Sequence, residues 1–128
     1  MRSFNFILLA GIVMAGCSKK TSAPATDCLR YAPANVVRIE KAAAGKDGAT
    51  TVHFQVSGGC GQFNKFIEKN NGNTRTITVE AVYKGCMCTM DMPIRTTSYK
   101  FNEKKAGTYY LQFVSGENEF VTDTVVIK

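Results

Sequence analysis

The sequence has no tryptophan, a single histidine and no Cys-x-x-Cys pair. The lack of tryptophan excludes the Cys…Trp…Cys core of antibody-type domains. Without paired histidines or a Cys-x-x-Cys motif, the usual ligand spacings of a zinc site are missing. A thiol–disulfide exchange enzyme is also disfavoured, because such enzymes place Cys-x-x-Cys at a helix N-terminus, where the helix dipole lowers the thiol pKa.

Long apolar runs and blocks of one charge are missing as well. The apolar run at residues 4–13 is far too short for a bilayer-spanning helix, which needs about 20 residues. The net charge of the chain is +6, but the basic side chains are spread along it, and the adjacent basic pairs are at 19–20 and 104–105. A nucleic-acid binder would carry a basic stripe with interleaved aromatic residues. We therefore exclude nucleic acid as a partner.

The first seventeen residues carry the clearest signal in the chain. Arg2 supplies a positive charge, the apolar run follows, and Met14-Ala15-Gly16-Cys17 comes next. This segment resembles the lipobox of bacterial lipoproteins, with Met14 at the position where the family usually has leucine. The resemblance implies that residues 1–16 are a lipoprotein signal peptide. It also implies cleavage before Cys17 and acylation of that cysteine, with palmitate among the expected acyl groups.

The same resemblance implies a location. The chain would be held by its lipid in a membrane of the Gram-negative cell envelope. An Asp directly after the lipidated cysteine would resemble an inner-membrane retention signal. This chain has Ser18 at that position, so we expect the outer membrane. Residues 17–27 then form a polar tether behind the lipidated Cys17, since they lack apolar periodicity. Residues 28–128 remain as one domain with a single modest core.

Four cysteines follow the tether: Cys28, Cys60, Cys86 and Cys88. An even count in a small exported domain favours disulfides, which stabilise by roughly 2–4 kcal/mol each. On an extended strand, the Cα atoms of Cys86 and Cys88 would be about 6.5–7 Å apart, at or beyond the disulfide limit. Two pairings stay open, Cys28–Cys86 with Cys60–Cys88, or Cys28–Cys88 with Cys60–Cys86.

From residue 35 onward the pattern of the chain is typical of β-structure. Val52, Phe54 and Val56 alternate with polar residues and should face a core. Turn signals at 45–48 and 70–73 contain glycine and asparagine. The segment 62–69 fits either a helical turn or an irregular strand. The other predicted strands are 36–39, 51–56, 76–83, 96–101, 108–114 and 119–127. About seven short strands with regular turns predict an all-β, Ig-like antiparallel β-sandwich, stabilised by disulfides.

The C-terminal third adds a second resemblance. Tyr99-Lys100-Phe101, followed by Gly107-Thr108-Tyr109, resembles the last strands of bacterial Ig-like modules, in which a Gly-x-Tyr run enters the penultimate strand. Together with the lipobox, the chain resembles small uncharacterised Ig-like lipoproteins of Gram-negative envelopes. That resemblance implies no specific ligand.

One segment carries distinctive chemistry, the run Gly-Cys-Met-Cys-Thr-Met-Asp-Met at 85–92. On a strand, Cys86, Cys88, Met90 and Met92 would share one face. Two thiols and two thioethers are soft ligands, which suit Cu(I), so copper binding is an alternative function. The competing interpretation is that the cysteines form disulfides and the methionines pack in the core.

Enzymatic chemistry has little support. His53 alternates with Thr51 and Gln55, which predicts a solvent-exposed side chain, and no carboxylate stands near it in the sequence to orient it in a Ser-His-Asp arrangement. An aromatic binding surface could instead be lined by Phe63, Phe66, Tyr83, Tyr109 and Tyr110. Tyr109 and Tyr110 should point to opposite faces, one buried and one exposed.

The sequence thus predicts a non-enzymatic binding or accessory module, attached to a membrane through its lipid anchor. Its ligand would be an unidentified protein or glycan, and we expect no cofactor. The alternative is a copper-binding lipoprotein that uses Cys86, Cys88, Met90 and Met92.

Overall fold

The computed structural model describes residues 28–41 and 48–128. The predicted signal peptide 1–16, the lipidation site Cys17, the tether 17–27 and most of the predicted turn at 45–48 lie outside the described residues.

Seven β-strands account for the regular structure of the described residues. They are β1 (Leu29–Lys41), β2 (Ala49–Gln55), β3 (Gly61–Asn71), β4 (Thr74–Lys84), β5 (Ile94–Lys100), β6 (Gly107–Gly116) and β7 (Glu119–Ile127). A search of residues 28–41 and 48–128 finds no helix with the length and apolarity needed to cross a bilayer.

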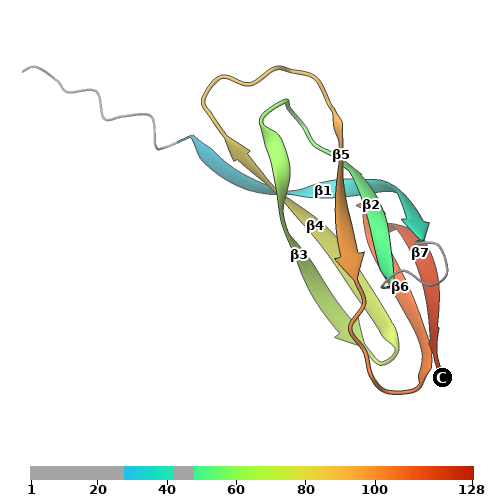
Figure 1. Ribbon diagram of the computed structural model, residues 1–128. Helices are drawn as coiled ribbons and strands as arrows, with labels where there is room; N and C mark the ends of the chain where they lie inside the picture. The colour runs from blue at the N-terminus through green and yellow to red at the C-terminus, as the bar shows by residue number, and fades with distance from the viewer. Residues whose placement is uncertain (1–27, 42–47) are drawn as a thin grey trace, which may run out of the picture.

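Strand β1 belongs to both layers of the sandwich (Figure 1). Its first half, from Leu29 to Ala34, pairs antiparallel with β4. Its second half, from Asn35 onward, pairs antiparallel with β2, whose other neighbour is β5. One layer therefore contains β5, β2 and the second half of β1. The other contains β3, β4, β6, β7 and the first half of β1.

One strand pair departs from the predicted antiparallel pattern. Residues 74–77 of β4 pair in parallel with residues 110–113 of β6, while the other paired strands run antiparallel. The reason is that β1 occupies the same edge of β4 only along residues 79–84, which leaves the start of β4 free for β6. The predicted fold class, an all-β sandwich of about seven strands with disulfides, is confirmed.

The core lies between the two layers, as the alternation in the sequence predicts. Val52, Phe54 and Val56 of the second predicted strand are fully buried. They meet the inward face of β4 and of β6, made of Ile77, Val79, Ala81, Tyr83, Leu111 and Phe113. Tyr99 of β5 packs edge-on between Phe66 of β3 and Phe113 of β6, with ring centroids 5.1 and 5.4 Å away. Aromatic rings therefore join the layers across the core.

The ambiguous segment at 62–69 is a strand, within β3. A bulge between Phe63 and Lys65 places Phe63 opposite Ala81 and Phe66 opposite Val79 of β4. Ala81 and Val79 are two residues apart and share the core face, so Phe63 and Phe66 also face the core although they are three residues apart. The extra residue of the bulge is what made the spacing resemble a helical turn.

Strand β1 begins at Leu29 and not near residue 36, because its first half pairs with β4.

The predicted aromatic surface is divided between the core and the exterior. Tyr109 is buried and Tyr110 is half-exposed, which confirms the expected opposite orientation. Tyr83, Phe63 and Phe66 pack on the core, so most of the predicted aromatic surface is interior.

Candidate binding groove at the disulfide-bonded end

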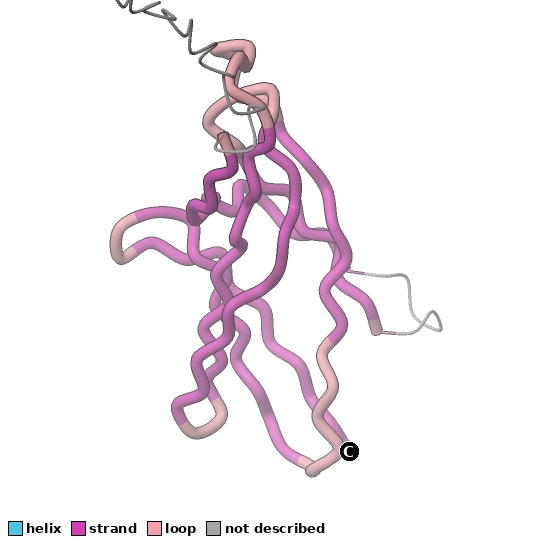
Figure 2. Tube along the Cα trace, turned by 90° about the vertical axis from the view of Figure 1, so that its left-hand side faces the viewer, coloured by secondary structure: helices cyan, strands magenta, loops and turns pink. Residues whose placement is uncertain are grey.

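Two disulfides lie at one end of the sandwich. Cys28 is bonded to Cys86, and Cys60 to Cys88, with Cα–Cα separations of 4.9 and 5.4 Å. The structure thereby selects the first of the two pairings that the sequence left open. We call this end, made of residues 28–31, 56–60 and 85–93, the disulfide pole. It lies opposite the C-terminus in both views of the chain (Figures 1 and 2).

The loop at 85–93 is not the strand on which the shared-face prediction rested. Cys86 is bonded to the start of β1, whereas Cys88 is bonded to the loop between β2 and β3. Because the two cysteines bind different segments, the chain between β4 and β5 turns and does not extend. The methionines of this loop do not pack in the core either, since Met87 and Met90 have exposed fractions of 95% and 100%.

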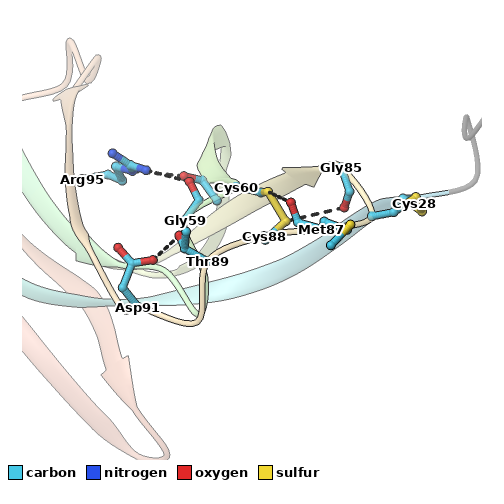
Figure 3. The surroundings of a disulfide bond; sticks show 11 residues. Cys28, Gly59, Cys60, Gly85, Met87, Cys88, Thr89, Asp91 and Arg95 are labelled. Carbon is cyan, nitrogen blue, oxygen red and sulfur yellow. Dashed lines mark hydrogen bonds between the residues drawn. A yellow bond between two sulfur atoms is a disulfide. The ribbon is translucent and has the colours of Figure 1, made fainter.

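Hydrogen bonds fix this loop and the start of β5 against the β2–β3 connection, and Figure 3 shows the one from Arg95 to Gly59. The amide of Gly59 donates to the carbonyl of Thr89 at 3.0 Å, and the amide of Val56 donates to the carbonyl of Pro93 at 3.1 Å. Arg95 donates from Nη2 to the carbonyl of Gly59 at 3.0 Å and from Nε to that of Gly61 at 3.1 Å. These hydrogen bonds therefore hold the loop, the β2–β3 connection and the start of β5 together.

A groove of about 560 Å³ opens at this pole. Its polar corner is formed by Ser57, whose amide and hydroxyl donate to the Tyr83 hydroxyl at 2.9 and 3.1 Å. The Arg30 guanidinium carbon lies 4.2 Å from the centroid of the Tyr83 ring, in cation–π contact. The remaining lining residues are the cysteines 28, 86 and 88 together with Leu29, Gly58, Gly85, Thr89, Met90 and Met92. The groove thus combines an apolar lining with a few fixed polar groups, the usual character of a binding site.

Several apolar side chains in the pole, or next to it in the sequence, are exposed. Besides Met87 and Met90, roughly half of each of Leu29, Tyr31, Met92 and Ile94 is exposed. A cluster of this kind at a loop end is typical of a surface that contacts a partner. Met90 and Met92 therefore do not pack in the core, as one interpretation of the sequence predicted, because the loop presents them to solvent.

Copper binding through thiolates would require that the disulfides be reduced first. Cys86 and Cys88 are both in disulfides and become thiolate ligands only after reduction. In the part of the chain that the structure describes, no three His, Cys, Asp or Glu side chains are grouped to hold a metal ion. Copper binding stays a prediction that depends on the redox state of these cysteines.

His53 is not the exposed side chain that the alternation predicted, because only 12% of it is accessible. Its Nε2 lies 3.2 Å from Glu40 Oε1, and its Nδ1 lies 3.4 Å from the Arg38 guanidinium. Nε2 is buried and forms no hydrogen bond, so it lies close to a carboxylate without bonding it. Arg38 and Glu40 flank His53 from the paired strand β1, so the carboxylate near this histidine comes from across the sheet.

A family model described as the ORF11 beta-sandwich domain matches residues 50–127, from β2 to β7. The match includes Cys60, Cys86 and Cys88 and leaves Cys28 and β1 outside it. No curated protein and no solved structure matches the chain.

Proposed function

We propose that this chain, which belongs to the ORF11 beta-sandwich domain family, is a lipid-anchored lipoprotein of the cell envelope. It acts as a non-enzymatic binding module, and its binding site is the groove at the disulfide pole. The observation that carries this proposal is the groove itself, with fixed polar groups inside and exposed methionines around it.

The lipid anchor is supported by the Met14-Ala15-Gly16-Cys17 segment. The two disulfides are in keeping with an exported chain, because disulfides persist in oxidising compartments. The lipid on Cys17 would attach the domain to the outer membrane.

The binding role is supported by the rigidity of the pole. Two disulfides and the hydrogen bonds from Arg95 hold the groove in one shape before any ligand arrives. A preorganised site loses less conformational entropy on binding. The methionines can adapt to different apolar shapes, because their side chains are unbranched and polarizable. A protein segment or a glycan with an apolar face fits such a groove.

Lipidation is tested by expressing the full chain in a Gram-negative host and measuring the mass of its mature N-terminal peptide. We expect an acylated peptide that begins at Cys17, and a Cys17→Ser variant that lacks the acyl mass. An unmodified, uncleaved N-terminus would contradict the anchor.

The groove is tested through its methionines. The five methionines of the chain are Met1, Met14 and the three in the loop at Met87, Met90 and Met92. After cleavage before Cys17, methionine methyl labelling with ¹³C would therefore report on the disulfide pole alone. Met90 and Met92 line the groove. Titration with envelope glycan fragments and extended apolar peptides should therefore change the chemical shifts of their methyl groups. Signals that stay fixed throughout the panel would count against a glycan or peptide site.

A further inference from the structure

The exposed apolar surface at the disulfide pole is wider than the groove. Within the pole, Met87 and Tyr31 are exposed but do not line it. A ligand held within the groove would leave these two side chains in water. A partner that covers both of them must be broad and must tolerate projecting side chains.

The loop that exposes Met87 is held in place by two disulfides and by backbone hydrogen bonds. Cys86 and Cys88 attach the loop to two different segments, and Gly59 and Val56 bind its backbone from beneath. The loop therefore carries Met87 and Met90 outward on a fixed base. Figure 3 shows this base, with the Cys60–Cys88 bridge and the contact from Arg95 to Gly59.

The charge around the pole favours an anionic partner. Arg30 lies in the groove lining, and Lys84 is exposed at the end of β4, opposite Leu29 of β1. The acidic side chain of the pole is Asp91, which already accepts a hydrogen bond from the Thr89 hydroxyl. Arg95 is turned inward to the carbonyls of Gly59 and Gly61.

The disulfide pole is the end of the domain that follows Cys17, the predicted lipidation site, in the sequence. Cys28, the first described residue, lies in the pole, and the C-terminus lies at the opposite end (Figures 1 and 2). Residues 18–27 separate Cys28 from Cys17, so a lipid on Cys17 can be at most about 40 Å away along the chain. An anchor of this length keeps the pole, and not the other end, at a high local concentration next to the bilayer.

We propose that the disulfide pole is a membrane-docking surface, in which Met87 and Met90 insert into the interface of an anionic bilayer. Arg30 and Lys84 face the lipid headgroups, and Tyr31 sits at the headgroup level, where tyrosine side chains are favoured. The bilayer surface is thus a second partner of the disulfide pole, beside the protein or glycan ligand of the groove, and this inference rests on the lipid anchor of the proposed function.

The test uses the chain from Ser18 to Lys128, which carries no lipid. The buried core residues that the structure describes and both disulfides lie within residues 28–128, so this chain keeps the contacts that hold the described fold. Binding is measured by co-sedimentation with vesicles of phosphatidylethanolamine and phosphatidylglycerol, and with vesicles of neutral lipid. We expect binding to the anionic vesicles that weakens as salt is raised, since salt screens surface charges.

Substitutions separate the apolar contribution from the charge. The double variant Met87→Ser, Met90→Ser should lower the partition coefficient at least about tenfold on anionic vesicles, because it removes two apolar side chains from the interface. Its matched control is Val126→Ser, an exposed apolar position on β7 away from the pole, which should change binding by less than about twofold. Lys84→Gln should weaken binding to anionic vesicles by roughly fivefold, while Lys100→Gln at the far end of β5 should not.

The proposal would be overturned by no binding of the unsubstituted chain to anionic vesicles, or by equal binding of the Met87 and Met90 double variant. Methionine methyl signals that respond to a peptide or glycan but not to vesicles would also overturn it, and would assign the pole to such a ligand. Because the tested chain lacks Cys17, a failure of vesicle binding leaves lipidation untouched. An absent lipid on Cys17 would likewise leave the vesicle result standing.

Discussion

Gly59 and Thr89 are in such close contact that a Cβ atom at position 59 would overlap the Thr89 hydroxyl oxygen. The Gly59 amide also donates to the Thr89 carbonyl at 3.0 Å. This contact is where the loop carrying Cys88 rests on the loop carrying Cys60, so a glycine at 59 is a condition for the shape of the pole.

Gly59→Ala should therefore destabilise the protein by about 1–3 kcal/mol, the usual range for overpacking. Urea unfolding monitored by circular dichroism measures the loss. Gly116→Ala is the matched control, because a Cβ there meets the flexible end of the Glu119 side chain. In a double-mutant cycle, adding Thr89→Ala should recover part of the loss, since the hydroxyl is the closest obstacle. Purely additive effects would contradict this contact.

Both disulfides should be complete in the exported protein. Alkylation of the denatured, unreduced chain from Ser18, followed by mass spectrometry, should find no free thiol, and peptide mapping should recover Cys28–Cys86 and Cys60–Cys88. The double substitution Cys60→Ser, Cys88→Ser should lower the free energy of unfolding by about 3–4 kcal/mol, given the sequence separation of 28 between the two cysteines.

The same thiol count decides the copper alternative. Two or more free thiols at Cys86 and Cys88 would contradict the disulfide assignment and make a Cu(I) titration of the loop with Met90 and Met92 the next measurement.

Alkaline pH should weaken the fold through Tyr99. Burial raises the pKa of the Tyr99 hydroxyl, and its hydrogen bond to Glu68 raises that pKa further. The neutral phenol is favoured in the folded state, so its contribution is fully present below the unfolded tyrosine pKa of about 10 and is lost as pH rises above it.

Urea midpoints at about pH 8 and pH 10.5 measure this loss, which Tyr99→Phe should reduce. Tyr110→Phe, at a half-exposed position on β6, is the matched control for removing a phenol hydroxyl. An equal decline in all three proteins would show that another group is responsible.

Lys41 and Asp123 join β1 to β7 by an ion pair whose partners differ in exposure. The Asp123 side chain is almost fully buried, while the Lys41 side chain is largely exposed, with 2.5 Å between Nζ and Oδ1. Lys41→Met should destabilise by about 1–2 kcal/mol, because it leaves a buried carboxylate without its cation, although solvent screens the lysine end.

Lys100→Met serves as the control for this pair, since Lys100 is exposed at the end of β5 and has no ion pair among the described residues. Thermal unfolding at neutral pH measures both variants. Equal stability of the Lys41 variant and the unsubstituted protein would contradict a role for the pair in holding β7 to β1.

The sequence predicts the inward faces of the strands well. Val52, Phe54 and Val56 alternate with polar residues, and all three are buried. It predicts β3 less well, because the bulge between Phe63 and Lys65 changes the period of the strand. A bulge depends on how the strand pairs with its neighbour, and no residue within 62–69 specifies that pairing.

His53 shows the same limit. Its polar neighbours in the sequence predict exposure, but Arg38 and Glu40 of β1 cover its ring from across the sheet. A side chain on the outer face of a sheet can be buried by long charged side chains on the next strand, which alternation along one strand does not detect.

The sequence by itself determined the β-class of the fold, the inward residues of its strands and the presence of disulfides, because hydrophobic alternation and cysteine count are local properties. Only the tertiary structure decided which cysteines pair and where the methionines point. Those outcomes depend on which loops meet at one end of the sandwich. Cys86 and Cys88 lie two residues apart, yet bonding to Cys28 and to Cys60 bends the chain between β4 and β5 away from an extended strand and leaves Met87 and Met90 in solvent.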